Sequence, residues 1–306
     1  MRILVTGGAG YVGSVLVPML LSRDYKVVLL DNFLWGIKPI LHFAAHPHLE
    51  VVSGDIRNKP LIRELVEPAD AVLHLAATVG YPACAADPDR AISTNVDGTR
   101  NVVEAIKDQK LVFASTGSTY GKVDGLCTED TPIDPLTLYG KTKWEGEKLV
   151  TERGGIGLRF ATVFGISPRL RLDLLVNDFV YQALHNRQIV LYEGHFRRTF
   201  MHVLDAARAY LFALDHYEKM RGRAFNVGNN AMNYTKREIA KMIQQHVEFY
   251  LHEADVGADR DQRDYEVSYD RIQKLGYATA LTMADGLREA IRVLKHVKIV
   301  SEWRNV

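Results

Sequence analysis

The chain has 306 residues, of which 47% are apolar and 25% charged, a balance typical of a globular protein with a substantial core. Its 38 basic and 37 acidic residues leave a net charge of +1, which excludes a strong overall field for attracting nucleic acid or anionic lipid. Two cysteines are too few for a disulfide framework or a metal-ligand cluster, and no apolar stretch approaches the roughly 18 residues of a membrane helix. We therefore expect a cytoplasmic protein without metal, nucleic-acid or membrane partners.

Short apolar runs alternate with longer amphipathic ones in the first half of the chain, which is the pattern of strands and crossover helices in a parallel sheet. The expected strands are Ile3–Thr6, Lys26–Leu30, Glu50–Ser53, Ala71–Leu75, Leu111–Ala114 and Gly157–Phe160. The expected helices are Tyr11–Arg23, Lys59–Val66, Arg90–Lys107 and Tyr139–Arg153. This order predicts an α/β fold with a Rossmann-type, doubly wound parallel sheet.

The regular alternation ends near Gly165, and the rest of the chain indicates helices separated by short strands. These helices are expected at Leu172–Asn186, Leu204–Tyr217, Lys236–Gln245 and Met283–His296. We therefore predict a first domain over residues 1–165 that holds the sheet and a smaller, mixed lobe over residues 166–306. Part of the chain after residue 165 could still cross back and join the sheet of the first domain.

The strongest local motif is TGGAGYVG at residues 6–13, which follows the first strand and opens a helix. Glycines at positions 7, 10 and 13 (Gly7, Gly10 and Gly13) permit a tight turn, close backbone approach to a diphosphate and close contact between helix and sheet. Asp31 ends the second strand, where a carboxylate accepts hydrogen bonds from the adenosine ribose and repels a 2′-phosphate. Together these residues predict NAD as the cofactor. A structural glycine turn with a capping aspartate, or the use of NADP, are the alternatives.

Tyr139 and Lys143 are four residues apart on one predicted helix and therefore share a face. An ammonium beside a phenol favours the phenolate and lowers the tyrosine pKa from its ordinary value of about 10. Tyr139 thereby becomes a candidate general base. The alternative is an exposed pair with no catalytic role.

These motifs together resemble the extended short-chain dehydrogenase/reductase family over nearly the whole chain, in particular its nucleotide-sugar epimerase and dehydratase branch. The resemblance implies that Tyr139 is the base, that Lys143 also holds the nicotinamide ribose, and that the Thr116 hydroxyl contacts the reacting oxygen. Further cofactor contacts that it implies are Tyr11, Val12, Asn32, Asp55, Ile56, Leu75, Ala76, Ala77 and Asn95. Asp55 could equally form a turn and Asn95 a helix cap.

The branch of the family is indicated by residues 116–121, which read TGSTYG. In dehydratases of the family the corresponding segment begins with Thr-Asp-Glu. Decarboxylating relatives carry a Glu at the position of Ser118. The segment is more similar to the Ser-Ala-Thr-x-Tyr-Gly of UDP-glucose/galactose 4-epimerases. The resemblance therefore implies an NAD-dependent nucleotide-sugar 4-epimerase that works through a transient 4-keto intermediate. A 4-keto-nucleotide-sugar reductase and, more distantly, a non-catalytic NAD-sensing protein are the alternatives.

The resemblance to the family also implies candidate substrate contacts. Ser118 and Thr162 stand at substrate-contacting positions, and Thr162 replaces an asparagine of many relatives. Arg198 lies in a segment that resembles the family's phosphate-binding stretch, and Arg263, or alternatively Arg260, matches a second phosphate contact, although each arginine could be an ordinary surface residue. The sugar, its nucleotide and the reacting carbon stay open.

The basic run from Arg169 to Arg171 could line a phosphate pocket or flank a helix start, and we assign it no role from the sequence. A homodimer is expected, since the helices beginning near Arg90 and at Tyr139 resemble those that pair in relatives. The candidate contacts, which could instead face their own sheet, are Val102, Val103, Ile106 and Leu149.

Overall fold

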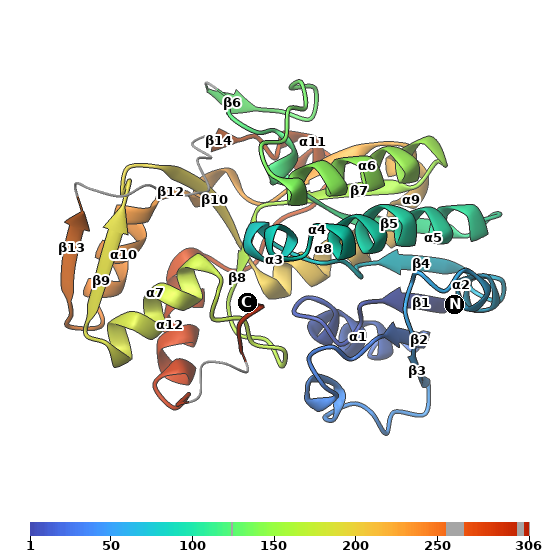
Figure 1. Ribbon diagram of the computed structural model, residues 1–306, viewed down its shortest axis with the longest axis horizontal. Coiled ribbons are helices and arrows are strands. Elements are labelled where there is room, and N and C mark those ends of the chain that lie inside the picture. Colours follow the sequence, from blue (N-terminus) through green and yellow to red (C-terminus); the bar gives the residue numbers. More distant parts are fainter. Residues whose placement is uncertain (124, 255–265, 299–302, 306) are drawn as a thin grey trace.

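The computed structural model describes residues 1–306 apart from 124, 255–265, 299–302 and 306. At its centre is a seven-stranded sheet in the order β11-β7-β5-β4-β1-β2-β3, and every pairing in it is parallel (Figure 1). Its strands are β1 (Arg2–Thr6), β2 (Lys26–Asp31), β3 (Leu49–Ser53), β4 (Ala71–His74), β5 (Lys110–Thr116), β7 (Ile156–Phe160) and β11 (Ala224–Val227). The predicted doubly wound fold is confirmed.

Apolar side chains on both faces of the strands hold the sheet between two helical layers. In β1, Ile3 and Val5 belong to one core cluster and Leu4 to another, and all three are fully buried. A parallel sheet covered on both faces needs such uninterrupted apolar runs. Each buried side chain of this kind contributes about 1.5–3 kcal/mol, so these short runs are sufficient to form strands.

Helices α1 (Gly13–Leu21) and α8 (Val203–Asp215) cover one face of the sheet, and their apolar residues complete the first core cluster. Helices α2 (Lys59–Val66), α5 (Thr99–Ala105) and α6 (Leu138–Glu152) cover the other face (Figure 1). The helix expected over Arg90–Lys107 is divided into α4 (Pro88–Ile92), a π-helical turn over Ser93–Gly98 and α5. The π-helical turn brings a buried asparagine toward the site described below.

The second lobe lies beyond the carboxyl ends of the sheet strands and has its own apolar core (Figure 1). Its main elements are β8 (Thr162–Phe164), α7 (Leu175–His185), β9 (Gln188–Tyr192), β10 (Arg197–His202), β12 (Asn233–Thr235), α10 (Lys236–Gln244), β13 (Tyr250–Ala254) and α12 (Met283–Leu294). Strand β11 and helix α8, however, return to the main sheet. Residues beyond 165 therefore contribute to both parts of the molecule.

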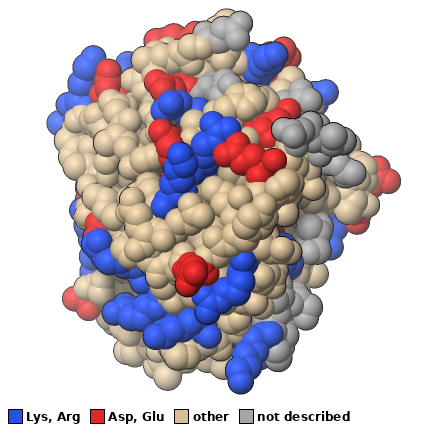
Figure 2. All heavy atoms as spheres, turned by 90° about the vertical axis from the view of Figure 1, so that its left-hand side faces the viewer, with Lys and Arg blue, Asp and Glu red and all other residues tan. Residues whose placement is uncertain are grey.

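Some of the charged side chains of the second lobe form ion pairs. Figure 2 shows acidic groups beside the basic ones on the outer face of this lobe, with broad uncharged areas between them. Arg237 pairs with Glu253, and Arg288 with Asp285 at 2.5 Å. Such exposed pairs contribute only about 0–1 kcal/mol each. None of the described helices is long and apolar enough to span a bilayer.

Candidate active site

A cavity of about 560 Å³ opens at the carboxyl ends of the sheet strands. It lies where the strand order reverses beside β1 and β4, the place where open parallel sheets bind their ligands. Most residues predicted from the sequence line it: Gly7, Gly10, Tyr11, Val12, Gly13, Asp31, Asn32, Asp55, Ile56, Leu75, Ala76, Ala77, Thr116, Ser118, Tyr139, Lys143 and Thr162. The motifs that are separated along the chain therefore meet around one space.

The glycine turn between β1 and α1 forms one end of this cavity. Gly7 has a φ of +74°, and a Cβ there would lie 2.7 Å from the backbone nitrogen of Ala76. A Cβ on Gly13 would lie 2.3 Å from the carbonyl oxygen of Gly7. No side chain caps the N-terminus of α1, and the positive end of this helix lies at the cavity wall. The turn therefore fits a dinucleotide diphosphate.

Asp31 lies at the end of β2 on the cavity wall. Its carboxylate accepts hydrogen bonds from the backbone nitrogens of Ala9, at 3.0 Å, and Phe33, at 2.9 Å. Burial raises the pKa of this carboxyl, which these backbone bonds partly oppose. The carboxylate is thus fixed in place with lone pairs left for ribose hydroxyls, whereas a 2′-phosphate would meet its negative charge.

Asp55 and Asn32 complete this wall. The guanidinium of Arg57 donates two hydrogen bonds to Asp55, at 2.9 and 2.7 Å, and holds the pKa of that carboxyl below its usual range. Asn32 accepts a hydrogen bond from the backbone nitrogen of Leu34 at 3.1 Å. Both side chains therefore shape the loops around the cavity while they line it.

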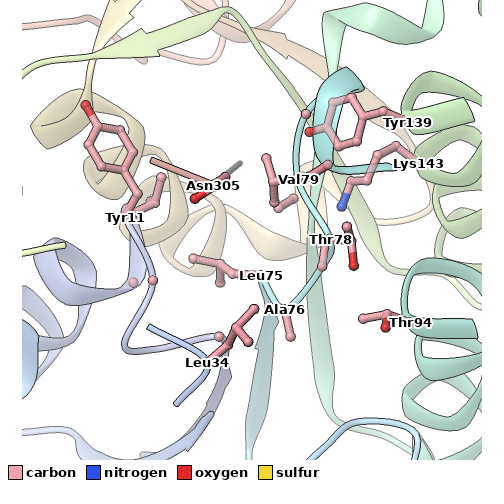
Figure 3. A pocket seen from close by; sticks show the side chains of 18 of the residues that line it. Tyr11, Leu34, Leu75, Ala76, Thr78, Val79, Thr94, Tyr139, Lys143 and Asn305 are labelled. Carbon is pink, nitrogen blue, oxygen red and sulfur yellow. The ribbon is translucent and has the colours of Figure 1, made fainter. Parts of the chain in front are cut away.

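Tyr139 and Lys143 extend from the first turns of α6 into the cavity (Figure 3). The helix begins there because Thr137 caps it by accepting a hydrogen bond from the Gly140 nitrogen at 3.1 Å. Thr116 ends β5 on the same wall, and its Oγ1 both accepts from the Ser118 nitrogen and donates to the Ser118 hydroxyl, at 3.2 Å each. The three predicted catalytic groups thus lie around one part of the cavity.

The environment of Lys143 is largely apolar. Only 3% of the residue is exposed, and its ammonium lies 4.0 Å above the centre of the Phe113 ring. Burial lowers the pKa of this ammonium from its ordinary 10.5 to about 7, while the nearby Cys84 and Glu147 act in the opposite direction. The lysine therefore changes protonation state near neutral pH in the protein without ligand.

Asn95 does not line the cavity. Its amide is buried, accepts a hydrogen bond from the Thr78 nitrogen at 2.8 Å and donates to the Thr78 carbonyl oxygen and the Thr142 hydroxyl, both at 3.0 Å. Thr78 does line the cavity, and Thr142 lies on α6 beside Lys143. Asn95 therefore connects the loop after β4 to the helix that carries Tyr139 and Lys143.

The arginines predicted to bind the substrate phosphates are not among the described residues that line the cavity. Arg198 lies on β10, is buried, and does not line the cavity. Arg263 and its alternative Arg260 lie outside the described residues. Two other arginines from the second half of the chain, Arg169 and Arg171, do line the cavity, as do Arg90 of α4 and Tyr210 of α8. The basic run at 169–171 was visible in the sequence, but nothing local showed which way it faces.

A buried ion pair behind the site holds α6 against the sheet. Glu147 of α6 pairs with Arg159 of β7 at 2.6 Å, and both side chains are at most 4% exposed. The Ser115 hydroxyl of β5 donates to Glu147 at 2.5 Å, and Arg159 donates to the Tyr120 hydroxyl at 2.9 Å. Since Glu147 follows Lys143 by one helical turn, this network fixes the helix that carries the predicted catalytic pair.

Comparison with known proteins agrees with this geometry. The family model described as "NAD dependent epimerase/dehydratase family" matches residues 3–228. A protein named putative UDP-glucose 4-epimerase from Methanocaldococcus jannaschii is 30% identical over 310 residues, covering 96% of this chain and 98% of its own. A protein named UDP-N-acetyl-alpha-D-glucosaminuronate decarboxylase from Bacillus cytotoxicus is 32% identical over 265 residues, covering 80% and 79%.

Among solved structures, the UDP-glucuronic acid 4-epimerase of Bacillus cereus in complex with UDP-glucuronic acid and NAD has a TM-score of 0.85 and 26% identity. It covers 96% of this chain and 99% of its own. These matches confirm the resemblance identified in the sequence and the cofactor that the glycine turn and Asp31 predict. The chain is an enzyme of the NAD-dependent epimerase/dehydratase family, within the extended short-chain dehydrogenases/reductases, and its cofactor is NAD.

Proposed function

We propose that the protein is a nucleotide-sugar 4-epimerase that oxidises a sugar hydroxyl and then returns the hydride to the opposite face of the same carbon. The observation that carries this proposal is that Tyr139, Lys143 and Thr116 line one cavity with the glycine turn and Asp31. This set supplies a base, a cation, a hydroxyl donor and a dinucleotide site, which is what a reversible alcohol oxidation needs.

The carboxylates of the cavity favour epimerisation over dehydration. Among the cavity-lining residues that the structure describes, they are Asp31, Asp55 and Asp87. Asp31 and Asp55 belong to the adenosine wall, and Asp87 is close enough to Arg57 to raise the pKa of that guanidinium. None of them stands beside Thr116, where Ser118 replaces the acidic residue. The side chains that would remove water from adjacent carbons are thus absent from this wall.

In the proposed reaction Tyr139 accepts the proton of the sugar hydroxyl, and the Thr116 hydroxyl donates a hydrogen bond to the reacting oxygen. Lys143 in its charged form stabilises the tyrosinate, and its pKa of about 7 lets it gain or lose a proton near neutral pH. Bound NAD supplies the hydride acceptor. The 4-keto sugar turns in the cavity, and Tyr139 returns the proton when the carbon is reduced from its other face.

The relatives support this activity by their names, since both the M. jannaschii protein and the B. cereus structure are called 4-epimerases. The test is to incubate the purified protein with UDP-glucose, UDP-galactose, UDP-glucuronic acid and UDP-galacturonic acid and to follow the products by NMR. We expect inversion at C4 with no net absorbance change at 340 nm. Stoichiometric consumption of added NADH by a 4-keto sugar would favour a reductase instead.

A Tyr139→Phe variant provides the matched control. It should retain NAD, because the glycine turn and Asp31 are untouched, and lose turnover by about 10²–10⁴-fold, the usual contribution of a general base. Full activity in this variant would contradict the assigned role of Tyr139. Absence of turnover with every nucleotide sugar in the wild-type protein would contradict the proposed function.

We also propose a homodimer, although the apolar residues first suggested for its contact are not available. Val102, Val103 and Ile106 are buried in the core of their own chain, and Leu149 packs partly against it. A contact through α5 and α6 would therefore use the exposed residues of these helices. Among them are Arg100 and Glu104 on α5 and Glu145 on α6. Light scattering after gel filtration, with charge reversal at Glu104, tests this assembly.

A further inference from the structure

The segment that follows β8 lies directly on the glycine turn. The Tyr11 hydroxyl donates to the Gly165 carbonyl oxygen at 2.7 Å, and the Ser167 hydroxyl donates to the Tyr11 carbonyl oxygen at 2.6 Å. Ser14, in the first turn of α1, lies 3.0 Å from Ser167, hydroxyl to hydroxyl. All of these contacts are buried, so the residues after Ser167 begin beside the N-terminus of α1, where a dinucleotide diphosphate binds.

Arg169 follows two residues later and lines the cavity, although only 2% of it is exposed. Its guanidinium lies 4.5 Å from the centre of the Trp35 ring and donates to the side-chain oxygen of Asn305 at 3.1 Å and to the Leu170 carbonyl oxygen. Its Nε is buried and has no hydrogen-bond partner among the described residues. Figure 3 shows Asn305 among the side chains of this cavity.

The charge of Arg169 is not neutralised by a carboxylate in the described part of the chain. Its neighbour Arg171, by contrast, forms an ion pair with Asp173 at 2.5 Å. A buried cation without a counter-ion is costly, by several kcal/mol in real proteins. Burial and the charge of Arg171 lower the pKa of the Arg169 guanidinium, which the nearby Asp173 opposes only in part. An anionic ligand in the cavity would relieve this cost.

We infer that Arg169 is a further cofactor-binding residue, which binds the diphosphate of NAD while Trp35 and Asn305 hold its guanidinium in place. This inference rests on the proposed NAD-dependent function. The cofactor's diphosphate is preferred over that of the nucleotide sugar because the segment of Arg169 rests on the glycine turn. In addition, Trp35 follows Asp31, the ribose ligand, by only four residues.

The contact also joins three distant parts of the chain at the cavity wall. Trp35 belongs to the first domain, Arg169 to the segment leading into the second lobe, and Asn305 lies 136 residues further along the chain. The segment of Asn305 is itself fixed, because the Trp303 carbonyl oxygen accepts a hydrogen bond from the Leu172 nitrogen at 2.7 Å. Trp35, Arg169 and Asn305 therefore form a bridge at the cavity wall, where a bound dinucleotide would add a further contact.

The test compares Arg169→Met, which keeps the length of the side chain and removes its charge, with the wild-type full-length protein. After removal of bound cofactor, titration measures the Kd of NAD, ADP-ribose, adenosine and UDP. We expect the Kd of NAD and of ADP-ribose to rise by about 10–100-fold, since a hydrogen bond to a charged group is lost. Adenosine and UDP should bind unchanged, and NAD affinity should depend less on salt than in the wild type.

Arg304→Met serves as the matched control. Arg304 pairs with Asp178 at 2.6 Å and does not line the cavity, so this variant removes a nearby arginine without removing the proposed phosphate contact. It should bind NAD with the wild-type Kd. Thermal denaturation without ligand checks that Arg169→Met folds, and Arg169→Lys should recover part of the NAD affinity.

Three results would overturn the inference: an unchanged Kd for NAD in Arg169→Met, an equal loss of adenosine binding, which indicates a structural role, or a loss confined to UDP. These results are independent of the turnover assay. A wild-type protein that binds NAD but inverts no sugar would refute the proposed epimerase and leave Arg169 as a cofactor ligand. A wild-type protein that binds no NAD would refute both.

Discussion

Replacing Lys143 by methionine should abolish activity and, at the same time, stabilise the protein without ligand. The reason is the burial of the ammonium among apolar groups, which lowers its pKa from 10.5 to about 7 in the folded chain. The unfolded chain then binds more protons between these two values, so the free energy of unfolding of the wild type rises with pH across that window. Methionine has a similar length and no charge, and it removes this dependence.

The size of the effect follows from the pKa difference at about 1.36 kcal/mol per unit. Near pH 7 the buried lysine costs about 4 kcal/mol of stability, and near pH 9.5 it costs about 1 kcal/mol. The ammonium's contact with the Phe113 ring, 4.0 Å away, returns about 1–2 kcal/mol where the lysine is charged. We therefore expect Lys143→Met to be more stable than the wild type by about 2–3 kcal/mol near pH 7.

Urea unfolding of the cofactor-free proteins, measured near pH 7 and near pH 9.5, checks this expectation. The stability difference between Lys143→Met and the wild type should fall by about 1–2 kcal/mol between the two conditions. Lys141→Met is the control, because Lys141 lies two residues away on the same helix and is exposed, and its stability difference should not change. Parallel pH dependence in Lys143→Met and the wild type would refute the assigned burial of the charge.

Two further variants test the support of the site. Glu147→Leu should destabilise the protein by about 3–5 kcal/mol, because Arg159 is left as a buried, unpaired cation, and adding Arg159→Met should restore most of the loss in urea unfolding. Asp31→Ala should weaken NAD binding and reduce the preference for NAD over NADP by about ten-fold, since the carboxylate held by Ala9 and Phe33 is removed. An unchanged ratio of the two Kd values would contradict the second expectation.

The cofactor side of the site could be predicted from the sequence because its determinants are local. The glycine turn joins β1 to α1 without a break, and Asp31 ends the neighbouring strand, so their relative placement follows from two adjacent elements of the sheet. The helix Lys59–Val66 was predicted with its observed bounds, because Asn58 caps it and Pro60 suits its first turn. Tyr139 and Lys143 are likewise fixed by one helix.

Features that depend on distant parts of the chain were not predicted. Strand β11 was missed because it has only four residues, one of them the polar Asn226, and it returns to pair with β7 after a long excursion. The sequence predicts one continuous helix over Arg90–Lys107. In the structure a π-helical turn interrupts it, and Asn95 in this turn points inward and accepts a hydrogen bond from the backbone of Thr78. Such bonds form only once the loop after β4 is in place.

The position of Arg169 bears on the choice between epimerase and reductase. A reductase must exchange its oxidised cofactor for a reduced one in every turnover, so an additional anchor on the diphosphate would slow each cycle. An epimerase regenerates its cofactor in place, and tight retention costs it nothing. Arg169, held by Trp35 and Asn305, would be such an anchor, built from residues that only the fold brings together. Slow release of NAD from the wild type, accelerated in Arg169→Met while C4 inversion continues, would therefore connect the cofactor site to the proposed chemistry.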